Sequence, residues 1–312
     1  MMLLSRVADQ LLWGARYLER ADATARVVRN FTEVILDLPA GVASSWEPLL
    51  AIAGSREEFD RGHVRAAEQD IIRFLVADRE NLGSVVSSVA HARENLRTTR
   101  EVLPRAAWQT VNDLYLFTGR EPEAGVDRRS RIRFLNHVTE AVQQLDGVLD
   151  GSMLRDEAYE MWRLGQSLER ADMTTRVLGV RAAALLDAPE DRDLDYDDVQ
   201  WMGVLRAVTG LQMFQRSTRG PIHGADVVRF LVFEEQFPRS VKGCLARIRV
   251  ALSRLPREER TVPAAEALEA ALATVPVTAD DGAALDAAMD RLQIALAHVS
   301  DMVHATFVAA AE

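Results

Sequence analysis

The stretch LERADATARVV at residues 18–28 returns almost unchanged as LERADMTTRVL at residues 168–178. Eight of the eleven aligned positions are identical, and the two copies lie 150 residues apart. In both copies apolar residues recur at spacings of three and four, which is the period of an α-helix that buries one face. The repeated stretch therefore predicts one kind of helix that occurs twice in the fold.

The repeat continues beyond these two helices. Asp37 and Pro39 recur 150 residues later, and the triplet at residues 74–76 matches the triplet at residues 230–232 at an offset of 156. The change of offset indicates that six residues are inserted after Pro189. We therefore predict an all-α fold with two half-bundles related by a pseudo-twofold axis, followed by a C-terminal helical appendage.

Helical periodicity dominates the chain, and no segment shows the sustained alternation of a strand. Proline and glycine positions separate the predicted helices, which cover residues 3–37, 46–53, 63–77, 81–102, 105–117, 127–150, 156–186, 196–216, 224–235, 239–254, 264–273 and 280–310. These helices group into a first repeat over 1–126, a connecting helix within 127–155, a second repeat over 156–256, and the appendage over 257–312.

The composition excludes several classes of function. The 312 residues include 47 acidic and 37 basic ones, and the resulting formal charge of −10 opposes general binding to nucleic acid phosphates. A single cysteine, Cys244, rules out an intrachain disulfide and a cysteine-based zinc site. No secretory signal is legible, and no apolar run approaches the roughly 18 residues of a membrane span. We expect a cytoplasmic protein without nucleic acid or membrane partners.

The sequence also predicts neither a metal nor a cofactor. Its six histidines are scattered, with no pair at spacing i, i+4 and no Glu-x-x-His motif. It contains no glycine-rich phosphate loop of the nucleotide-binding type.

The repeated stretch places an arginine on the apolar face of each helix. On a helical wheel of about 100° per residue, Arg20 shares a sector with Trp13, and Arg170 lies similarly in the second copy. A buried guanidinium needs a carboxylate partner, because an unpaired buried charge costs several kcal/mol. Glu19 and Glu169 are the nearest candidates, each able to reach the arginine of the other half.

Two further ion pairs, Asp22–Arg26 and Asp172–Arg176, are predicted at the favourable i, i+4 spacing of a helix. The simplest interpretation is that these pairs and the second Glu-Arg dipeptide hold the half-bundles in register. The structural ion-pair residues are then Glu169, Arg170, Asp22, Arg26, Asp172 and Arg176.

A second set of arginines distinguishes the two halves. Arg93, Arg97 and Arg100 follow one another at i, i+4 and i+7, whereas the aligned stretch of the second half has lost most of these charges. Similarly, Arg16 of the first half aligns with Gln166. Several arginines on one face can hold a phosphate or a carboxylate through paired hydrogen bonds.

We expect this arginine face to lie toward Arg16 and Glu19 on the first helix and to form one anion-binding site. In such a site Glu19 and Arg20 are the candidate catalytic residues, with Glu19 as an orienting group or a base. The alternative is a solvated face on which Glu94 and Glu101 pair with the arginines.

Several separated blocks of the sequence resemble the bacterial alpha-E family. They are the segment from Trp13 to Asp22, the segment Ala92-Arg93-Glu94-Asn95, the segment from Ser152 to Arg155, and the second Leu-Glu-Arg-Ala-Asp run at residues 168–172. The family is an all-helical domain named for its Glu-Arg motif. Its members are typically encoded beside, or fused to, a circularly permuted ATP-grasp ligase, often with a transglutaminase-like protein.

This resemblance implies ATP-dependent formation of amide or peptide bonds, with the nucleotide site in the partner. Our first hypothesis is a partner subunit that binds an anionic substrate or intermediate through its arginine and glutamate cluster. The second is a structural adaptor whose Glu-Arg pairs only hold the bundle together. An independent hydrolase or transferase ranks last, because no nucleophile with a base and an oxyanion site is in view. The sequence leaves open whether the chain forms a homo-oligomer.

Overall fold

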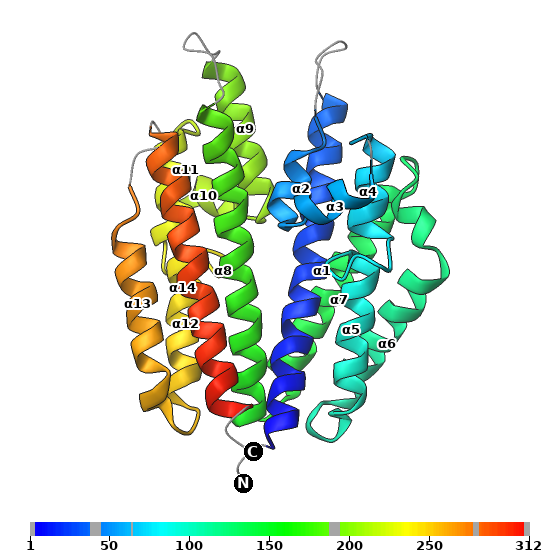
Figure 1. Cartoon of the computed structure of the whole chain (residues 1–312), viewed down its shortest axis with the longest axis vertical. Helices are drawn as coiled ribbons and strands as arrows, with labels where there is room; N and C mark the ends of the chain where they lie inside the picture. The colour runs from blue at the N-terminus through cyan, green and yellow to red at the C-terminus, as the bar shows by residue number, and fades with distance from the viewer. Residues whose placement is uncertain (1–3, 38–44, 64, 187–193, 277–280, 309–312) are drawn as a thin grey trace. The chain divides into compact units, whose positions relative to one another are not determined.

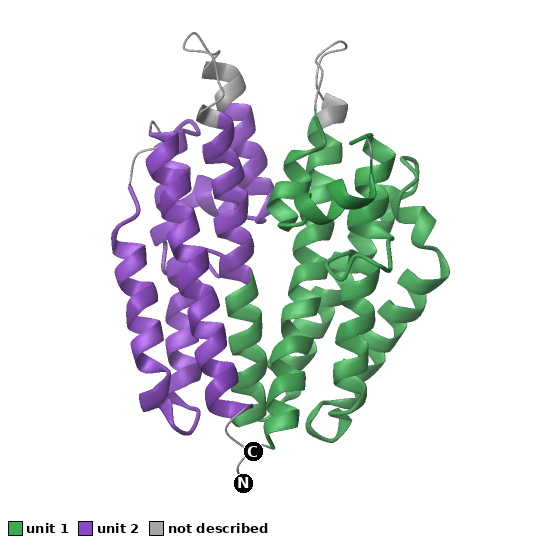
Figure 2. Cartoon of the chain, viewed as in Figure 1, with its two compact units in different colours: residues 1–169, 311–312 green, residues 170–310 purple. Residues whose placement is uncertain are grey.

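The computed structural model describes residues 4–37, 45–63, 65–186, 194–276 and 281–308. Within these ranges every regular element is a helix, and no strand occurs (Figure 1). The predicted all-α class is confirmed. The chain divides into two compact units, Met1–Glu169 with Ala311–Glu312 and Arg170–Ala310 (Figure 2).

Unit 1 is built around the long first helix. Its elements are α1 (Ser5–Asp37), α2 (Pro48–Ala53), α3 (Arg56–Gly62), α4 (Glu68–Val76), α5 (Val85–Arg97), the 3₁₀ turn η1 (Arg100–Val102), α6 (Arg105–Arg120), the 3₁₀ turn η2 (Pro122–Gly125), α7 (Arg131–Ser152) and the first part of α8 (Glu157–Leu186). Helix α1 packs against α5 and α7, and α6 packs against the same two helices. Apolar side chains such as Leu11, Ile72 and Leu135 fill the core between them, fully shielded from solvent.

Unit 2 begins inside α8 and continues to the last described helix. Its further elements are α9 (Leu194–Ala207), α10 (Leu211–Ser217), α11 (Gly224–Phe233), α12 (Val241–Ser253), the 3₁₀ turn η3 (Glu258–Arg260), α13 (Val262–Ala273) and α14 (Gly282–Phe307). Helix α12 packs against α11 and α13, and α13 packs against α14. The core includes Leu245, Leu268 and Leu292.

The same capping motif starts α5 and α12. Ser84 and Ser240 are the N-cap residues, and each hydroxyl oxygen accepts a hydrogen bond from the backbone N–H three residues further on. Each hydroxyl also donates to the carbonyl oxygen six residues earlier, that of Asp78 or Glu234. The two helices are 13 residues long, and their caps lie 156 residues apart, the offset found in the sequence.

An aromatic pair also recurs. Phe59 and Phe74 meet edge to face in unit 1, with ring centroids 5.3 Å apart, and Phe214 and Phe230 do so in unit 2 at 5.6 Å. Such edge-to-face contacts are the favoured geometry for buried aromatic rings. The pseudo-twofold relation between the halves stays a prediction.

Three predicted helices differ from expectation. The helix predicted over 63–77 begins only at Glu68. The helix predicted over 81–102 begins only after the Ser84 cap and ends at Arg97. The helix predicted over 196–216 is broken, because Thr209 adopts a left-handed backbone conformation with φ of 54° between α9 and α10. Helix α3 was not predicted.

The predicted connecting helix and appendage have packing partners inside the two units. Helix α7, which lies within 127–155, packs against α1 and α6 in unit 1. Helices α13 and α14, within 257–312, extend the packing of α12 in unit 2. In the described part of the chain, no helix is both long and apolar enough to cross a membrane.

Candidate functional site

Four side chains form a half-buried strip along α1, which we call the α1 strip: Trp13, Arg16, Tyr17 and Arg20. Their spacing of i, i+3, i+4 and i+7 places them on one face of the helix. The residues between them, such as Gly14, are buried against neighbouring helices. The strip is therefore a polar and aromatic line at the border of a packed helix.

A single buried carboxylate holds both arginines of the α1 strip. The Nε–H of Arg16 donates to Oε2 of Glu169 at 2.9 Å, and the Nε–H of Arg20 donates to Oε1 at 2.6 Å. The Glu169 side chain is 1% exposed, whereas Arg16 and Arg20 are 15% and 27% exposed. The prediction that Glu169 reaches Arg20 is confirmed, but Arg20 is less buried than its wheel position indicates.

The close approach of α8 to α1 depends on a glycine. A Cβ atom at Gly165 would collide with the carbonyl oxygen of Leu12 and would also meet Ala15. The missing side chain lets the two backbones come together at this point. Glu169 follows one helical turn later on α8, which brings its carboxylate within reach of the arginines.

The carboxyl of Glu169 stays ionised in this environment. Its burial raises the pKa, but the charges of Arg20 and Arg16 and their hydrogen bonds outweigh burial, so that the pKa lies below its ordinary value. The carboxylate therefore orients two guanidinium groups, each of which keeps its positive charge.

Aromatic rings support the same two guanidiniums. The Arg16 guanidinium lies 4.7 Å from the centroid of the Trp13 ring, and that of Arg20 lies 5.8 Å from the Tyr17 ring. Tyr17 stacks in turn on His91 of α5 at 5.2 Å. Cation–π contacts of this kind orient an arginine without neutralising it, so the strip can attract an anion.

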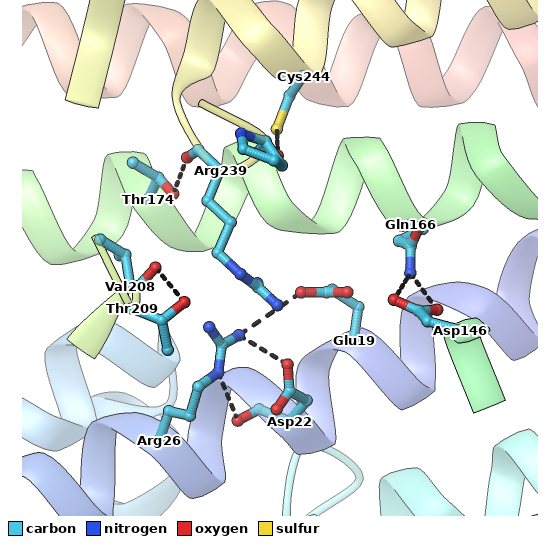
Figure 3. Close-up of polar contacts among 11 residues, drawn as sticks. Glu19, Asp22, Arg26, Asp146, Gln166, Thr174, Val208, Thr209, Arg239 and Cys244 are labelled. Atoms are coloured by element: carbon cyan, nitrogen blue, oxygen red, sulfur yellow. Dashed lines mark hydrogen bonds and ion pairs between the residues drawn. The ribbon is translucent and has the colours of Figure 1, made fainter. Parts of the chain in front are cut away.

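Glu19 faces the interior. Its carboxylate lies 3.6 Å from the guanidinium of Arg26, which also binds Asp22 at 2.8 Å (Figure 3). All three side chains are at most 2% exposed. Adjacent helix positions point about 100° apart, so Glu19 does not share a face with Arg20. The orienting role expected of Glu19 is therefore filled by Glu169.

The other predicted ion-pair residues differ in burial. The Asp22–Arg26 pair is buried, whereas Asp172 and Arg176 meet at 2.7 Å with side chains 17% and 30% exposed. Arg170, the counterpart of Arg20 in the second copy, is buried at 8% exposure.

The structure divides the predicted arginine cluster. Arg93 on α5 donates to Asn112 of α6 at 3.3 Å and lies over the Tyr115 ring at 4.8 Å. Arg100 lies over Trp108 of α6 at 5.1 Å. These two arginines therefore face α6.

Arg97 makes a local pair. Its guanidinium donates to the exposed carboxylate of Glu94 at 2.6 Å, as the alternative interpretation of this face expected. Helix α5 turns other residues toward α1: His91 stacks on Tyr17, and Leu96 packs over Gly14. Among the described contacts, the arginines of α5 and η1 therefore meet α6 and Glu94, whereas those of α1 meet Glu169.

The position that matches Arg16 in the second copy has another role. Gln166 is 2% exposed, and its amide donates to both carboxylate oxygens of Asp146 on α7, at 2.6 and 2.7 Å (Figure 3). It also accepts a hydrogen bond from Arg163. A buried amide here links two helices of unit 1.

Sequence reasoning missed one fully buried charge. Arg131 at the start of α7 donates to Glu68 at 3.0 Å and to the carbonyl of Val126 at 2.9 Å. Burial raises the pKa of Glu68, yet the hydrogen bonds from Arg128 and Arg131 bring it below its ordinary value. The only signal in the sequence was that Arg131 lies near the start of a predicted helix, among other charged residues.

No metal centre is present among the described residues, since no three histidine, cysteine or acidic side chains gather there. Cys244 is buried, and its sulfur lies 3.5 Å from the carbonyl oxygen of Pro238.

A family model described as a predicted alpha-helical domain with a conserved ER motif, named Alpha-E, matches residues 3–308. The chain belongs to the Alpha-E family. Glu19-Arg20 and Glu169-Arg170 are Glu-Arg dipeptides of the kind named in that description. In this Alpha-E chain, Glu169 of one dipeptide binds Arg20 of the other.

Similar curated proteins are much longer. Uncharacterized proteins of Mycobacterium bovis and Mycobacterium tuberculosis are 25% identical over 273 residues, which cover 80% of this chain and 30% of each relative. The Alpha-E chain therefore spans under a third of the length of these relatives. No solved structure shows significant similarity to it.

Proposed function

We propose that this Alpha-E chain is a partner subunit of an ATP-grasp-type ligase system that forms amide or peptide bonds. The main support is the length of its relatives, in which the matched region makes up only 30% of a longer polypeptide. A domain that makes up only part of longer relatives is expected to work together with other domains or proteins. The family resemblance implies that this partner is a circularly permuted ATP-grasp ligase, accompanied in some systems by a transglutaminase-like protein.

In this proposal the ligase supplies the ATP site, and the α1 strip binds an anionic substrate or intermediate. Acyl phosphates and acidic amino acids carry the negative charge that two oriented guanidiniums attract. Arg16 and Arg20 are the binding residues, and Glu169 is a positioning residue that acts through them. Because the proposed chemistry consumes ATP, the proposal includes a cytoplasmic location for both proteins.

A structural adaptor is the second candidate, and one observation favours it. The Glu169 carboxylate is 1% exposed and hydrogen-bonds both arginines, which is the arrangement expected of a purely architectural ion-pair cluster. An adaptor would contribute assembly to the system, and its arginines would not contact substrate.

The first experiment measures ATP turnover by a circularly permuted ATP-grasp ligase from the same organism, with and without the purified Alpha-E protein, against a panel of amino acids. The proposal expects turnover to rise on addition of the chain and to depend on an acidic substrate. Turnover that is the same without the chain would contradict a partner role.

A variant comparison separates substrate binding from adaptor function. Arg16→Ala should raise the KM for the anionic substrate about tenfold or more, because a charge-assisted hydrogen bond contributes roughly 1.5–3 kcal/mol. Arg176→Ala is the matched control, since it removes a half-buried, ion-paired arginine that belongs to unit 2 and is not part of the α1 strip. If both variants assemble with the ligase and turn over like the parent, the adaptor function survives and the substrate site is excluded.

A further inference from the structure

A second group of basic residues lies where α5, η1 and α6 meet. We call it the α5–α6 arginine surface and define it by Arg93, Arg97, Arg100 and Trp108. The side chains of Arg93 and Arg97 are 28% and 45% exposed, and Arg100 is an exposed residue. Its members are therefore accessible to a macromolecular partner.

Aromatic rings hold two of these arginines in place. Arg93 and Arg100 both lie over Trp108, with guanidinium carbons 5.6 and 5.1 Å from the ring centroid, and Arg93 also lies over Tyr115. The Nε–H of Arg100 further donates to the carbonyl oxygen of Arg97 at 3.0 Å. Side chains that are already ordered lose less conformational freedom on binding, which favours association.

The surface keeps an excess of positive charge despite its acidic neighbours. Glu94 pairs with Arg97 at 2.6 Å and lies 3.9 Å from Arg93. The segment 93–105 nevertheless contains four arginines and two glutamates in a chain whose formal charge is −10. A local positive surface on a negative protein favours encounter with an acidic partner.

The matching helix of unit 2 shows that the fold does not require these charges. Positions 94 and 97 correspond at an offset of 156 to Val250 and Ser253, and α12 is still a capped helix of the same length. Arg93 corresponds to Arg249, which pairs with Glu269 on α13 at 2.8 Å, and α12 also carries Lys242 and Arg247. The arginines of α5 therefore call for an explanation other than helix formation.

We propose that the α5–α6 arginine surface docks an acidic helical segment of a partner protein. Arg93 and Arg97 lie one helical turn apart, about 6 Å along the axis, which matches carboxylates at i and i+4 on a partner helix. Three cations spread over a helix and the turn that follows it suit several carboxylates better than one small phosphate. The acidic surroundings oppose an extended nucleic acid backbone.

This docking surface goes beyond the substrate binding proposed for the α1 strip and requires neither ligase nor substrate. The test titrates the full chain, by calorimetry, with a helix-forming alanine peptide that carries glutamate at every fourth position. We expect saturable binding at low ionic strength that weakens as salt is added, and no binding of the matched peptide with glutamine in place of glutamate. A parent protein that fails to bind the acidic peptide would overturn the proposal.

Variants locate the binding. Arg93→Ala and Arg100→Ala should each weaken binding about three- to fivefold, the effect of an exposed ion pair, whereas Glu94→Gln should strengthen it by removing a competing carboxylate. Arg249→Ala is the matched control on the equivalent helix and should bind like the parent. Equal losses in Arg93→Ala and Arg249→Ala would overturn the assignment to α5. If duplex DNA or inorganic phosphate bound more tightly than the peptide, the proposed acidic helix would be wrong and the ligand would belong to another class.

Discussion

Helices α5 and α12 share the same length and cap but differ at some of their exposed positions. Both are 13 residues long and start at a serine cap with the same hydrogen bonds. Arg97 on α5, however, corresponds to Ser253 on α12, and Glu94 corresponds to the half-exposed Val250. The comparison shows that caps and apolar contacts determine these helices, while their exposed charges are free to serve other purposes.

The two copies of the repeated helix differ in a similar way. Arg16 on α1 is partly exposed, lies over Trp13 and binds Glu169. Its counterpart Gln166 on α8 is buried and binds Asp146. We infer that binding chemistry is concentrated in the first half of the chain, and the following predictions test that inference.

The largest expected effect is the loss of the shared carboxylate. Glu169→Ala should lower the free energy of unfolding by about 2–4 kcal/mol, because it leaves two partly buried guanidiniums without their common partner. Arg20→Ala should cost only about 1 kcal/mol, since Arg16 still satisfies the carboxylate. Urea unfolding measures both values. An Arg20→Ala loss as large as that of Glu169→Ala would mean that Arg16 does not share the carboxylate.

The serine caps provide the next test. Ser84→Ala and Ser240→Ala should each cost about 1–2 kcal/mol, because each removes a buried cap and its hydrogen bond to an upstream carbonyl. Urea unfolding of the two variants checks whether the losses are equal. A large loss for one variant and none for the other would break the equivalence of α5 and α12.

Acidification should weaken the α1 strip. The pKa of Glu169 is depressed in the folded state below its ordinary value of 4.5, so its contribution to stability is fully present above pH 4.5 and is lost as the pH falls through the folded pKa. Unfolding free energies measured from neutral to strongly acidic pH should therefore fall in that window. Glu169→Gln should show a shallower fall there. An identical pH dependence in parent and variant would contradict the assigned pairing.

The smallest expected effect lies on the surface of α5. Glu94→Gln should leave the melting temperature unchanged, because the Glu94–Arg97 pair is exposed to solvent. Differential scanning calorimetry checks this expectation. A clear loss of stability would mean that the Glu94–Arg97 pair stabilises the fold, which would contradict the view that these exposed charges are not needed for the helix.

Much of this fold could be predicted from the period of the apolar residues and from the proline and glycine positions between helices. The apolar spacing indicated helices across the chain, and residues 18–28 and 168–178 indicated the long central ones. The break at Thr209 could not be predicted, because a β-branched residue rarely adopts the positive φ found here at the end of α9. Buried Arg131 depends in the same way on partners 63 residues away in sequence.

The candidate site could be predicted in part. The helical wheel placed Arg20 on the apolar face, whereas its side chain is 27% exposed, and Glu169 was an expected partner. The sharing of Glu169 with Arg16 was not foreseen, because it requires the approach of α8 that Gly165 permits. The separation of Arg93 and Arg100 from Arg16 arises because α5 presents His91 and Leu96 to α1.

The central claim is that the first half binds the anionic substrate through the α1 strip. The most direct measurement is kcat/KM for ATP-dependent amide formation by the ligase complex containing Arg16→Gln, which gives α1 the residue found at the matching position of α8. We predict a loss of about tenfold or more in kcat/KM, with the complex still assembled and Arg176→Gln equal to the parent. Unchanged kcat/KM in the assembled Arg16→Gln complex would contradict the claim.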